Sequence, residues 1–270
     1  MRRLHAFEWE DQSWLPRVFR DFITDHLKYT HSQPMREGIN LAIARQLSSV
    51  LDRSGSTTIV DLCSGAGGPV SQIGRLLAER RTTPVRILVT DLFPNESAFR
   101  ALEAESAGLI HGRYQATDAA DVPGELEGVR TIFTAIHHFT PRQVQGVLAD
   151  AVRKRAPIAV FEPLERRVQM AALVGAMSFL RGLTHTHRVG RLTVARSVLT
   201  YIVPVAPMMF AWDGMISCLR SYNADELLAI ANQVEAAEYA WEAGSFYVSG
   251  PFGPMPTTFL IGLPATGRPE

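Results

Sequence analysis

Apolar residues in the first fifty positions recur every three or four residues, which is the period of an amphipathic helix. Two runs have this spacing: Trp14, Val18, Phe19, Phe22 and Ile23, and then Ile39, Ile43 and Leu47. Gln33-Pro34 separates them, because the residue before a proline disfavours the helical backbone. We therefore expect a helical segment over residues 1–50, broken near position 33.

From residue 57 the pattern changes to short apolar runs, each closed by a polar residue. The runs that predict strands are 57–62, 85–90, 113–117, 131–136 and 158–161. Helical stretches lie between them, over 95–107 for example and after Thr140, where Pro141 and Gln143 complete the pattern of a capped helix start. Strands that alternate with helices indicate a parallel sheet covered on both faces.

The alternation stops after Glu162. Residues 164–220 are apolar with scattered arginines and predict a helical insertion. The pattern returns with a capped helix start at 221–227, and two strands at 239–248 and 257–263 flank a turn-rich loop, which predicts an antiparallel hairpin. The expected fold is α/β, with a Rossmann-like, mostly parallel sheet of seven strands that ends in this hairpin.

Composition narrows the function classes. Lys plus Arg and Asp plus Glu both number 27, so there is no basic excess for a large nucleic acid. Two cysteines give neither a disulfide framework nor zinc spacing, and His185 and His187 face apart on a helix, so we expect no metal. The start of the chain has no secretory pattern, and a cytoplasmic location is expected.

Residues 194–212 are mostly apolar and close to the length of a membrane span. Arg196, Pro204 and Pro207 oppose a lone spanning helix. Three alternatives remain for the apolar surface of 164–220: contact with a membrane surface or lipid-like ligand, packing within the chain, or a homodimer face.

Polar residues close the predicted strands, and parallel sheets bind ligands at these carboxyl ends. They are Asp61, Asp91, Asp118, the pair His137 and His138, and Glu162. Glycines follow the first strand in the run 60–68. A dinucleotide loop would need glycines where Cys63 and Val70 stand, so the run departs from the G-x-G-x-x-G pattern.

The order of these motifs resembles that of the class I S-adenosylmethionine (SAM)-dependent methyltransferases, over residues 57–163 and 221–264. The resemblance implies that SAM is the cofactor, and that one set of residues surrounds it. That set is Asp61, Cys63, Gly65 and Gly67 at the methionine part, Asp91 and Leu92 at the ribose, Asp118 and Ala119 at the adenine, and Ala135 before the histidine pair. Cys63 stands where the family usually has its first glycine.

The resemblance also implies an organisation and an activity. A single domain would consist of a helical cap (1–50), a SAM-binding core (57–163 and 221–264) and a helical lid (164–220). The candidate catalytic residues are His137, His138 and Glu162. Either histidine could instead be a hydrogen-bonded pocket residue, and Glu162 could be a base, an orienting partner for a histidine or a helix cap before Pro163. The candidate substrate-pocket residues are Trp212, Asp213, Arg220 and Tyr222.

The expected activity is methyl transfer to an oxygen or nitrogen of a small, fairly apolar molecule. The alternatives are a SAM-fold enzyme with another reaction, and a lipid-associated or membrane-associated binding protein.

Overall fold

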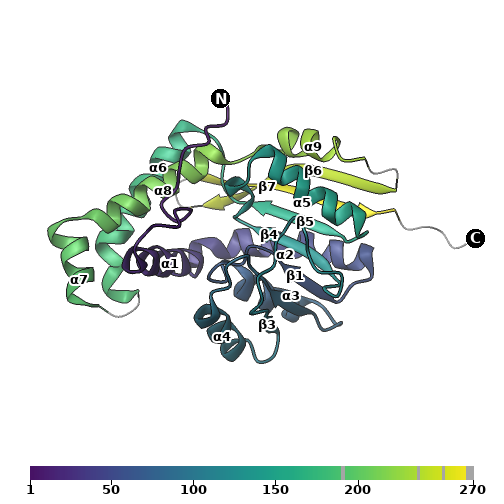
Figure 1. Ribbon diagram of the computed structural model, residues 1–270, viewed down its shortest axis with the longest axis horizontal. Helices are drawn as coiled ribbons and strands as arrows, with labels where there is room; N and C mark the ends of the chain where they lie inside the picture. The colour runs from purple at the N-terminus through teal and green to yellow at the C-terminus, as the bar shows by residue number, and fades with distance from the viewer. Residues whose placement is uncertain (190–191, 236–237, 251–252, 266–270) are drawn as a thin grey trace, which may run out of the picture. The chain divides into compact units, whose positions relative to one another are not determined.

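The computed structural model describes residues 1–189, 192–235, 238–250 and 253–265 (Figure 1). They form two compact units, each built from separate stretches of the chain. Residues 34–163 and 223–270 make the first, here called the sheet unit; residues 1–33 and 164–222 make the second, here called the helical unit. The expected boundary at residue 50 is therefore displaced: residues 34–54 belong with the sheet, and Tyr222 belongs with the helices.

One sheet of seven strands runs through the sheet unit, as predicted. The strands are β1 (Thr58–Asp61), β2 (Arg86–Val89), β3 (Ile110–Gly112), β4 (Val129–Phe133), β5 (Ile158–Glu162), β6 (Tyr239–Gly250) and β7 (Gly253–Pro264). Their order is β3-β2-β1-β4-β5-β7-β6. The first five pair in parallel, and β7 runs antiparallel to both of its neighbours, β5 and β6. The carboxyl ends of β1 to β5 consequently lie at one edge.

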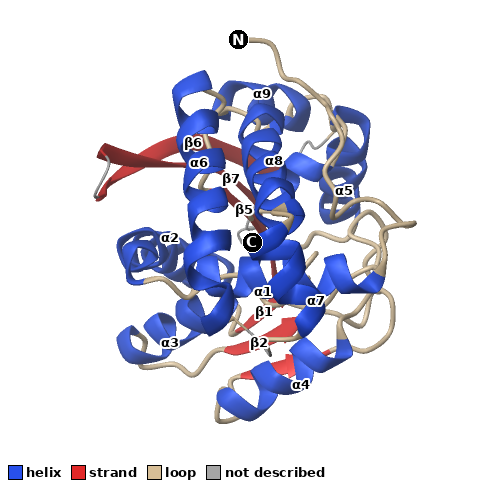
Figure 2. Ribbon diagram, turned by 90° about the vertical axis from the view of Figure 1, so that its left-hand side faces the viewer, coloured by secondary structure: helices blue, strands red, loops and turns tan. Residues whose placement is uncertain are grey.

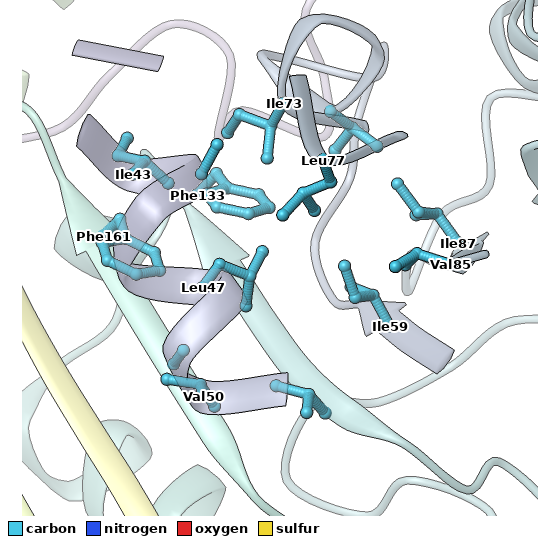
Figure 3. Close-up of a cluster of buried hydrophobic side chains, with 14 of the residues drawn as sticks. Ile43, Leu47, Val50, Ile59, Ile73, Leu77, Val85, Ile87, Phe133 and Phe161 are labelled. Carbon is cyan, nitrogen blue, oxygen red and sulfur yellow. The ribbon is translucent and has the colours of Figure 1, made fainter. Parts of the chain in front are cut away.

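Helices cover the two faces of this sheet. They are α2 (Glu37–Ser54, preceded by the short turn Pro34–Arg36), α3 (Val70–Arg80), α4 (Glu96–Glu105), α5 (Pro141–Arg153) and α9 (Ala224–Ala231). Buried side chains of α2, α3 and α4 share one core cluster with alternate strand residues such as Ile59, Ile87 and Phe133 (Figure 3). The intervening residues, such as Val60 and Ile132, point to the opposite face, because side chains alternate along a strand.

Several boundaries differ from those the pattern predicts. β3 lies at Ile110–Gly112 instead of 113–117, and the backbone N–H of Gly112 and the hydroxyl of Tyr114 both donate to the Glu103 carboxylate of α4. Glu103 therefore holds the residues just after Gly112 against α4, and the strand ends at Gly112. β4 stops at Phe133 because Thr134 has a left-handed backbone, with φ of +54°.

The helical unit contains α1 (Arg17–His31), α6 (Val168–His185), the turn η3 (Thr186–Arg188), α7 (Val194–Ser197), the π-helical turn η4 (Val198–Ile202) and α8 (Val205–Arg220). Helices α6 and α8 lie side by side (Figures 1 and 2). The helical prediction for 164–220 is confirmed over 168–188, 194–202 and 205–220, and residues 190–191 of this range lie outside the described residues. Trp14, which the pattern places on the first helix, lies before α1 and is 66% exposed, so that part of the prediction is wrong.

The apolar run 194–212 does not form one long helix. Among the described residues, no single helix has both the length and the apolar composition of a membrane span. The stretches Val194–Ile202 and Val205–Arg220 meet these criteria only together, and they are bent by 70° at the break between them. Pro204 lies in that break, where a proline interrupts the helical hydrogen bonds.

Candidate functional site

The glycine loop after β1 makes a series of left-handed turns. Cys63, Gly65, Gly67 and Gly68 have φ values of +57°, +53°, +99° and +40°. Glycine adopts this region without steric cost, whereas a residue with a Cβ does not. A Cβ at Gly67 would meet the Leu102 side chain at 2.5 Å, but one at Gly65 or Gly68 would meet nothing within 4 Å. The loop thus presents bare backbone beside open space at two positions.

Asp61 is the last residue of β1, and its side chain is hydrogen-bonded to the glycine loop. Its carboxylate accepts hydrogen bonds from the hydroxyls of Ser64 (2.5 Å) and Thr131 (2.7 Å), and its carbonyl accepts one from the backbone N–H of Thr90 (2.9 Å). The side chain is buried, and burial raises its pKa to about 7 against the two hydroxyl contacts, which lower it. Asp61 therefore ties β1, β4 and the loop together.

Asp91 follows β2, and its half-buried carboxylate contacts the same loop. One carboxylate oxygen accepts the Gly65 N–H at 2.8 Å, and the other accepts the Phe93 N–H at 2.8 Å. Leu92, between them, is exposed. A carboxylate has about four lone-pair sites, so two remain for a ligand.

Asp118 lies in the loop that follows β3. Its carboxylate accepts the Ala120 N–H at 2.8 Å, which forms a local turn, and the next residue, Ala119, is buried. One residue earlier, the N–H of Thr117 donates to the carbonyl of Asp91 at 2.8 Å. This contact brings the loop after β3 next to the end of β2.

The thiol of Cys63 lies within electrostatic range of all three acids. Burial raises the pKa of this thiol, and the negative charges of Asp91, Asp61 and Asp118 raise it further, in that order. Such an effect requires all three carboxylates to lie near the sulfur. The structure therefore brings together the acids that the sequence placed at three separate strand ends.

The next two strand ends carry a buried histidine–carboxylate pair. His137 lies in the short turn η2 (Ile136–His138) after β4, and its Nδ1 lies 2.8 Å from Oε2 of Glu162 at the end of β5. Both side chains are buried. The rings of His137 and His138 lie 4.2 Å apart, and Ala135 is the buried residue before the turn. This contact favours the orienting role among the three that the sequence left open for Glu162.

The four residues expected to line a substrate pocket all have partners within the helical unit. The indole N–H of Trp212 donates to the carbonyl of Phe7 at 2.9 Å. The guanidinium of Arg3 lies over the ring of Tyr222, 4.1 Å from its centroid. The two contacts fasten the N-terminal segment to the middle of α8 and to the residue pair that follows it.

Asp213 and Arg220 hold the same segment through a backbone hydrogen bond and an ion pair, respectively. The carboxylate of Asp213 accepts the backbone N–H of Trp9 at 2.7 Å, and burial raises its pKa to about 8. Arg220 is buried and pairs with Glu8 at 3.2 Å and with Asp11 at 2.6 Å. These contacts explain the two polar side chains without a ligand, and their place in a substrate pocket stays a prediction.

Four residues of the site escaped the sequence interpretation: Ser64, Thr90, Thr131 and Thr134. Ser64 had a usable signal, since a hydroxyl three residues after a strand-end acid can reach back to it. Thr131 lies inside β4 and Thr90 closes the apolar run 85–90, and in such runs a threonine is an ordinary β-branched residue. Nothing in the local pattern marks Thr134 as left-handed.

Comparison with known proteins gives a likeness of fold. No family model matches this chain, and no curated protein matches it. A solved structure of PigF with SAH is 15% identical, with a TM-score of 0.50, over 94% of this chain and 62% of that one. An O-methyltransferase family protein from Burkholderia thailandensis is 14% identical (TM-score 0.45; 89% of this chain, 63% of that one). The methyltransferase domain of bacterial CtHen1-C is 13% identical (TM-score 0.47; 84% and 99%).

At these identities the likeness concerns the fold. The order β3-β2-β1-β4-β5-β7-β6 with β7 reversed, together with the likeness to PigF, shows that this chain has the Rossmann-like fold of the class I methyltransferases.

Proposed function

We propose that this protein is a SAM-dependent methyltransferase that acts on an oxygen or nitrogen of a small, fairly apolar molecule. The observation that carries the proposal is the contact between Asp91 and Gly65, because it sets a half-exposed carboxylate beside a bare glycine backbone. An adenosyl ligand needs this combination: a carboxylate for the ribose hydroxyls and backbone N–H groups for the carboxylate of its methionine part.

The residues present fit such a cofactor. Open space lies beside Gly65 and Gly68, where a Cβ would meet nothing within 4 Å. Asp91 keeps two lone-pair sites for the ribose, and Asp118 with the buried Ala119 lies next to it for the adenine. Cys63 places a small side chain in the same loop, and its sulfur lies among the three carboxylates.

The histidine–carboxylate pair suits the proton transfer that methylation of a hydroxyl or amine requires. When bound, SAM would supply the electrophilic methyl carbon, so the protein binds, aligns and deprotonates. Glu162 accepts a hydrogen bond from the Nδ1–H of His137, so Nε2 is the nitrogen that takes a proton from the acceptor. Glu162 also stabilises the imidazolium that forms when His137 takes the acceptor's proton.

The first test is calorimetric titration with S-adenosylhomocysteine. We expect binding by the intact protein and a loss of affinity of at least about ten-fold in Asp91→Ala, the cost of one hydrogen bond to a charged group. Asp121→Ala is the matched control, because that carboxylate is exposed and pairs with Lys154. Absence of binding at millimolar ligand, or equal affinity in Asp91→Ala, contradicts the proposal.

The second test separates methyl transfer from another reaction on the same fold. Candidate acceptors are incubated with SAM and the products are weighed by mass spectrometry. A gain of about fourteen mass units, one CH₂, is expected for a methylated product. A cofactor that binds but yields only products of other mass would favour the non-methyl-transfer alternative.

A further inference from the structure

The stretch formed by α7 and η4 exposes apolar side chains on one face. Val194 belongs to α7, and Val198, Tyr201 and Ile202 belong to the π-helical turn that continues it. Their exposed fractions are 83%, 36%, 49% and 74%. Val203 directly continues this exposed surface. We call these five residues the apolar face.

The opposite side of the same stretch is polar and buried. Arg196 is 5% exposed, pairs with Asp25 of α1 and lies over the ring of Phe22, 4.6 Å from its centroid. Thr200 is 1% exposed, and its hydroxyl has no hydrogen-bond partner among the described residues. A helix of a water-soluble surface normally has the reverse arrangement, with its charged residue outside and its valines inside.

This inversion is costly in water. Burying an arginine and an unpartnered hydroxyl has a desolvation cost, and the valines and isoleucine outside gain nothing from the hydrophobic effect. The arrangement becomes favourable only if the apolar face meets a medium that excludes water. An apolar partner therefore explains both sides of the stretch at once.

Charge indicates which partner. Residues 166–212 contain six arginines (Arg166, Arg167, Arg181, Arg188, Arg191 and Arg196) and no aspartate or glutamate. Arg188 is exposed at the end of η3, and Lys28 is exposed on α1. Lys28 neighbours Tyr29, whose ring lies 5.2 Å from that of His185 at the end of α6. Exposed cations thus lie on the two segments that contact Arg196 from α1 and η3, through Asp25 and the Val189 carbonyl, and Asp25 itself is paired with Arg196.

We propose that the apolar face of α7 and η4 lies on the surface of an anionic lipid bilayer. Apolar side chains would enter the headgroup boundary, and Arg188 and Lys28 would meet lipid phosphates and carboxylates. A second copy of the chain would bring the same cations against each other, which is unfavourable. A nucleic acid would attract the cations but leave the valines and isoleucine without a role. This proposal does not rest on the methyltransferase activity.

The experiment is flotation of the full-length protein with vesicles. Two compositions are compared, phosphatidylcholine alone and phosphatidylcholine with 30% phosphatidylserine. We expect flotation with the second and at least ~ten-fold less with the first. The double variant Val194→Asp/Ile202→Asp should abolish flotation, since each charge opposes insertion into the bilayer. Arg188→Ser should reduce the bound fraction about five-fold, the effect of one cation near an anionic leaflet.

Val168→Asp is the matched control. Val168 is 63% exposed on the same unit, but it begins α6, about 26 Å along that helix from His185. Its substitution should leave flotation unchanged. Circular dichroism checks the folding of each variant, and S-adenosylhomocysteine titration shows separately whether the cofactor site is intact.

The proposal would be overturned if the intact protein floated with neither vesicle, or if the double variant floated equally well. It would also be overturned if the intact protein bound no vesicle and formed a dimer in light scattering that the double substitution converted to a monomer.

Discussion

Cys63 occupies a backbone conformation that suits glycine. Its φ of +57° lies in the left-handed region, where a residue with a Cβ costs about 1–2 kcal/mol. The neighbouring left-handed positions are glycines, so Cys63 is the strained member of the loop. The strain is tolerated because Asp61 and Thr90 fix the loop through hydrogen bonds to Ser64.

Replacing Cys63 by glycine should relieve that strain. We expect Cys63→Gly to raise the free energy of unfolding by about 0.5–1 kcal/mol over Cys63→Ala, after allowing for the greater freedom of glycine in the unfolded chain. Urea denaturation of both variants measures the difference. The alanine variant is the control because it also lacks the thiol but keeps the Cβ. A glycine variant that is less stable than the alanine variant would contradict the interpretation.

If Glu162 acts through His137, as proposed, its removal should affect turnover more than binding. Glu162→Gln keeps the shape of the side chain but loses the charge that orients and stabilises the imidazole. We expect kcat to fall about ten- to a hundred-fold with little change in KM, and the pH–rate profile to shift. Steady-state assays over a range of pH measure this with the acceptor identified by product mass.

Glu238→Gln is the control for that substitution, since Glu238 is exposed and pairs with Arg155. If Glu162→Gln changes KM and kcat in proportion, or changes only stability, the residue has a structural role instead.

The sequence revealed those site residues whose position follows from a local rule. Asp61, Asp91 and Glu162 each follow a short apolar run, and the parallel topology places such residues at one edge. The roles of Asp213 and Arg220 could not be read in this way. Their partners, Trp9 and Glu8, lie about two hundred positions earlier in the chain, and no periodicity reports a contact across that separation.

At the scale of elements, local signals again decide what was predictable. The capping box of Thr140 and Gln143 begins α5, and that of Asn223 and Glu226 begins α9, both as the residue patterns indicate. The third strand was misplaced because Ile110–Gly112 is too short for a pattern of period two. Its register comes from pairing with β2, which is a tertiary contact.

The N-terminal segment and α8 form an element pair joined by a buried ion pair. Arg220 is 2% exposed and faces Glu8, which is fully buried, and Asp11. Removing one partner of a buried pair costs about 3–5 kcal/mol, because the remaining charge loses its compensation. We therefore expect Arg220→Met to lower the free energy of unfolding by about that amount, measured by urea denaturation.

Arg100→Met is the control for Arg220→Met. Arg100 pairs with Glu96 on the surface of α4, and both side chains are more than 60% exposed. A surface pair of this kind contributes at most about 1 kcal/mol. Equal effects of the two substitutions would show that the buried pair does not hold the segment.

At the scale of the whole molecule, the candidate cofactor site and the apolar face lie in different units, each built from two separate stretches of the chain. The sheet unit carries the glycine loop, the three acids and the histidine–glutamate pair. The helical unit carries the apolar face and joins residues 1–33 to 164–222. The sequence pattern separated the insertion from the sheet and grouped residues 1–50 as one cap, whereas residues 34–54 pack with the sheet unit; amphipathic periodicity does not tell which core a helix covers.

Stability of the helical unit should depend on pH through His26. This side chain is buried and stacked on Phe210 with ring centroids 4.1 Å apart. Burial lowers its pKa from 6.5 to about 3, and Arg181 and His185 lower it further. Below pH 6.5 His26 is therefore protonated in the unfolded chain but stays neutral in the folded chain. The free energy of unfolding consequently falls as the pH drops from 6.5 toward 3.

His26→Phe removes this titration and keeps an aromatic ring against Phe210. As the pH falls from 7 to 5, the free energy of unfolding of the variant minus that of the wild type should rise by about 2 kcal/mol. This is the free energy of protonating the unfolded His26 at a pH about 1.5 units below its pKa. Leu15→Ala truncates the same core cluster without removing a titratable group, so its deficit should be equal at the two pH values. Urea denaturation of the three proteins at both pH values measures the difference, and a His26→Phe deficit that does not change with pH would mean that His26 titrates alike in the folded and unfolded chain.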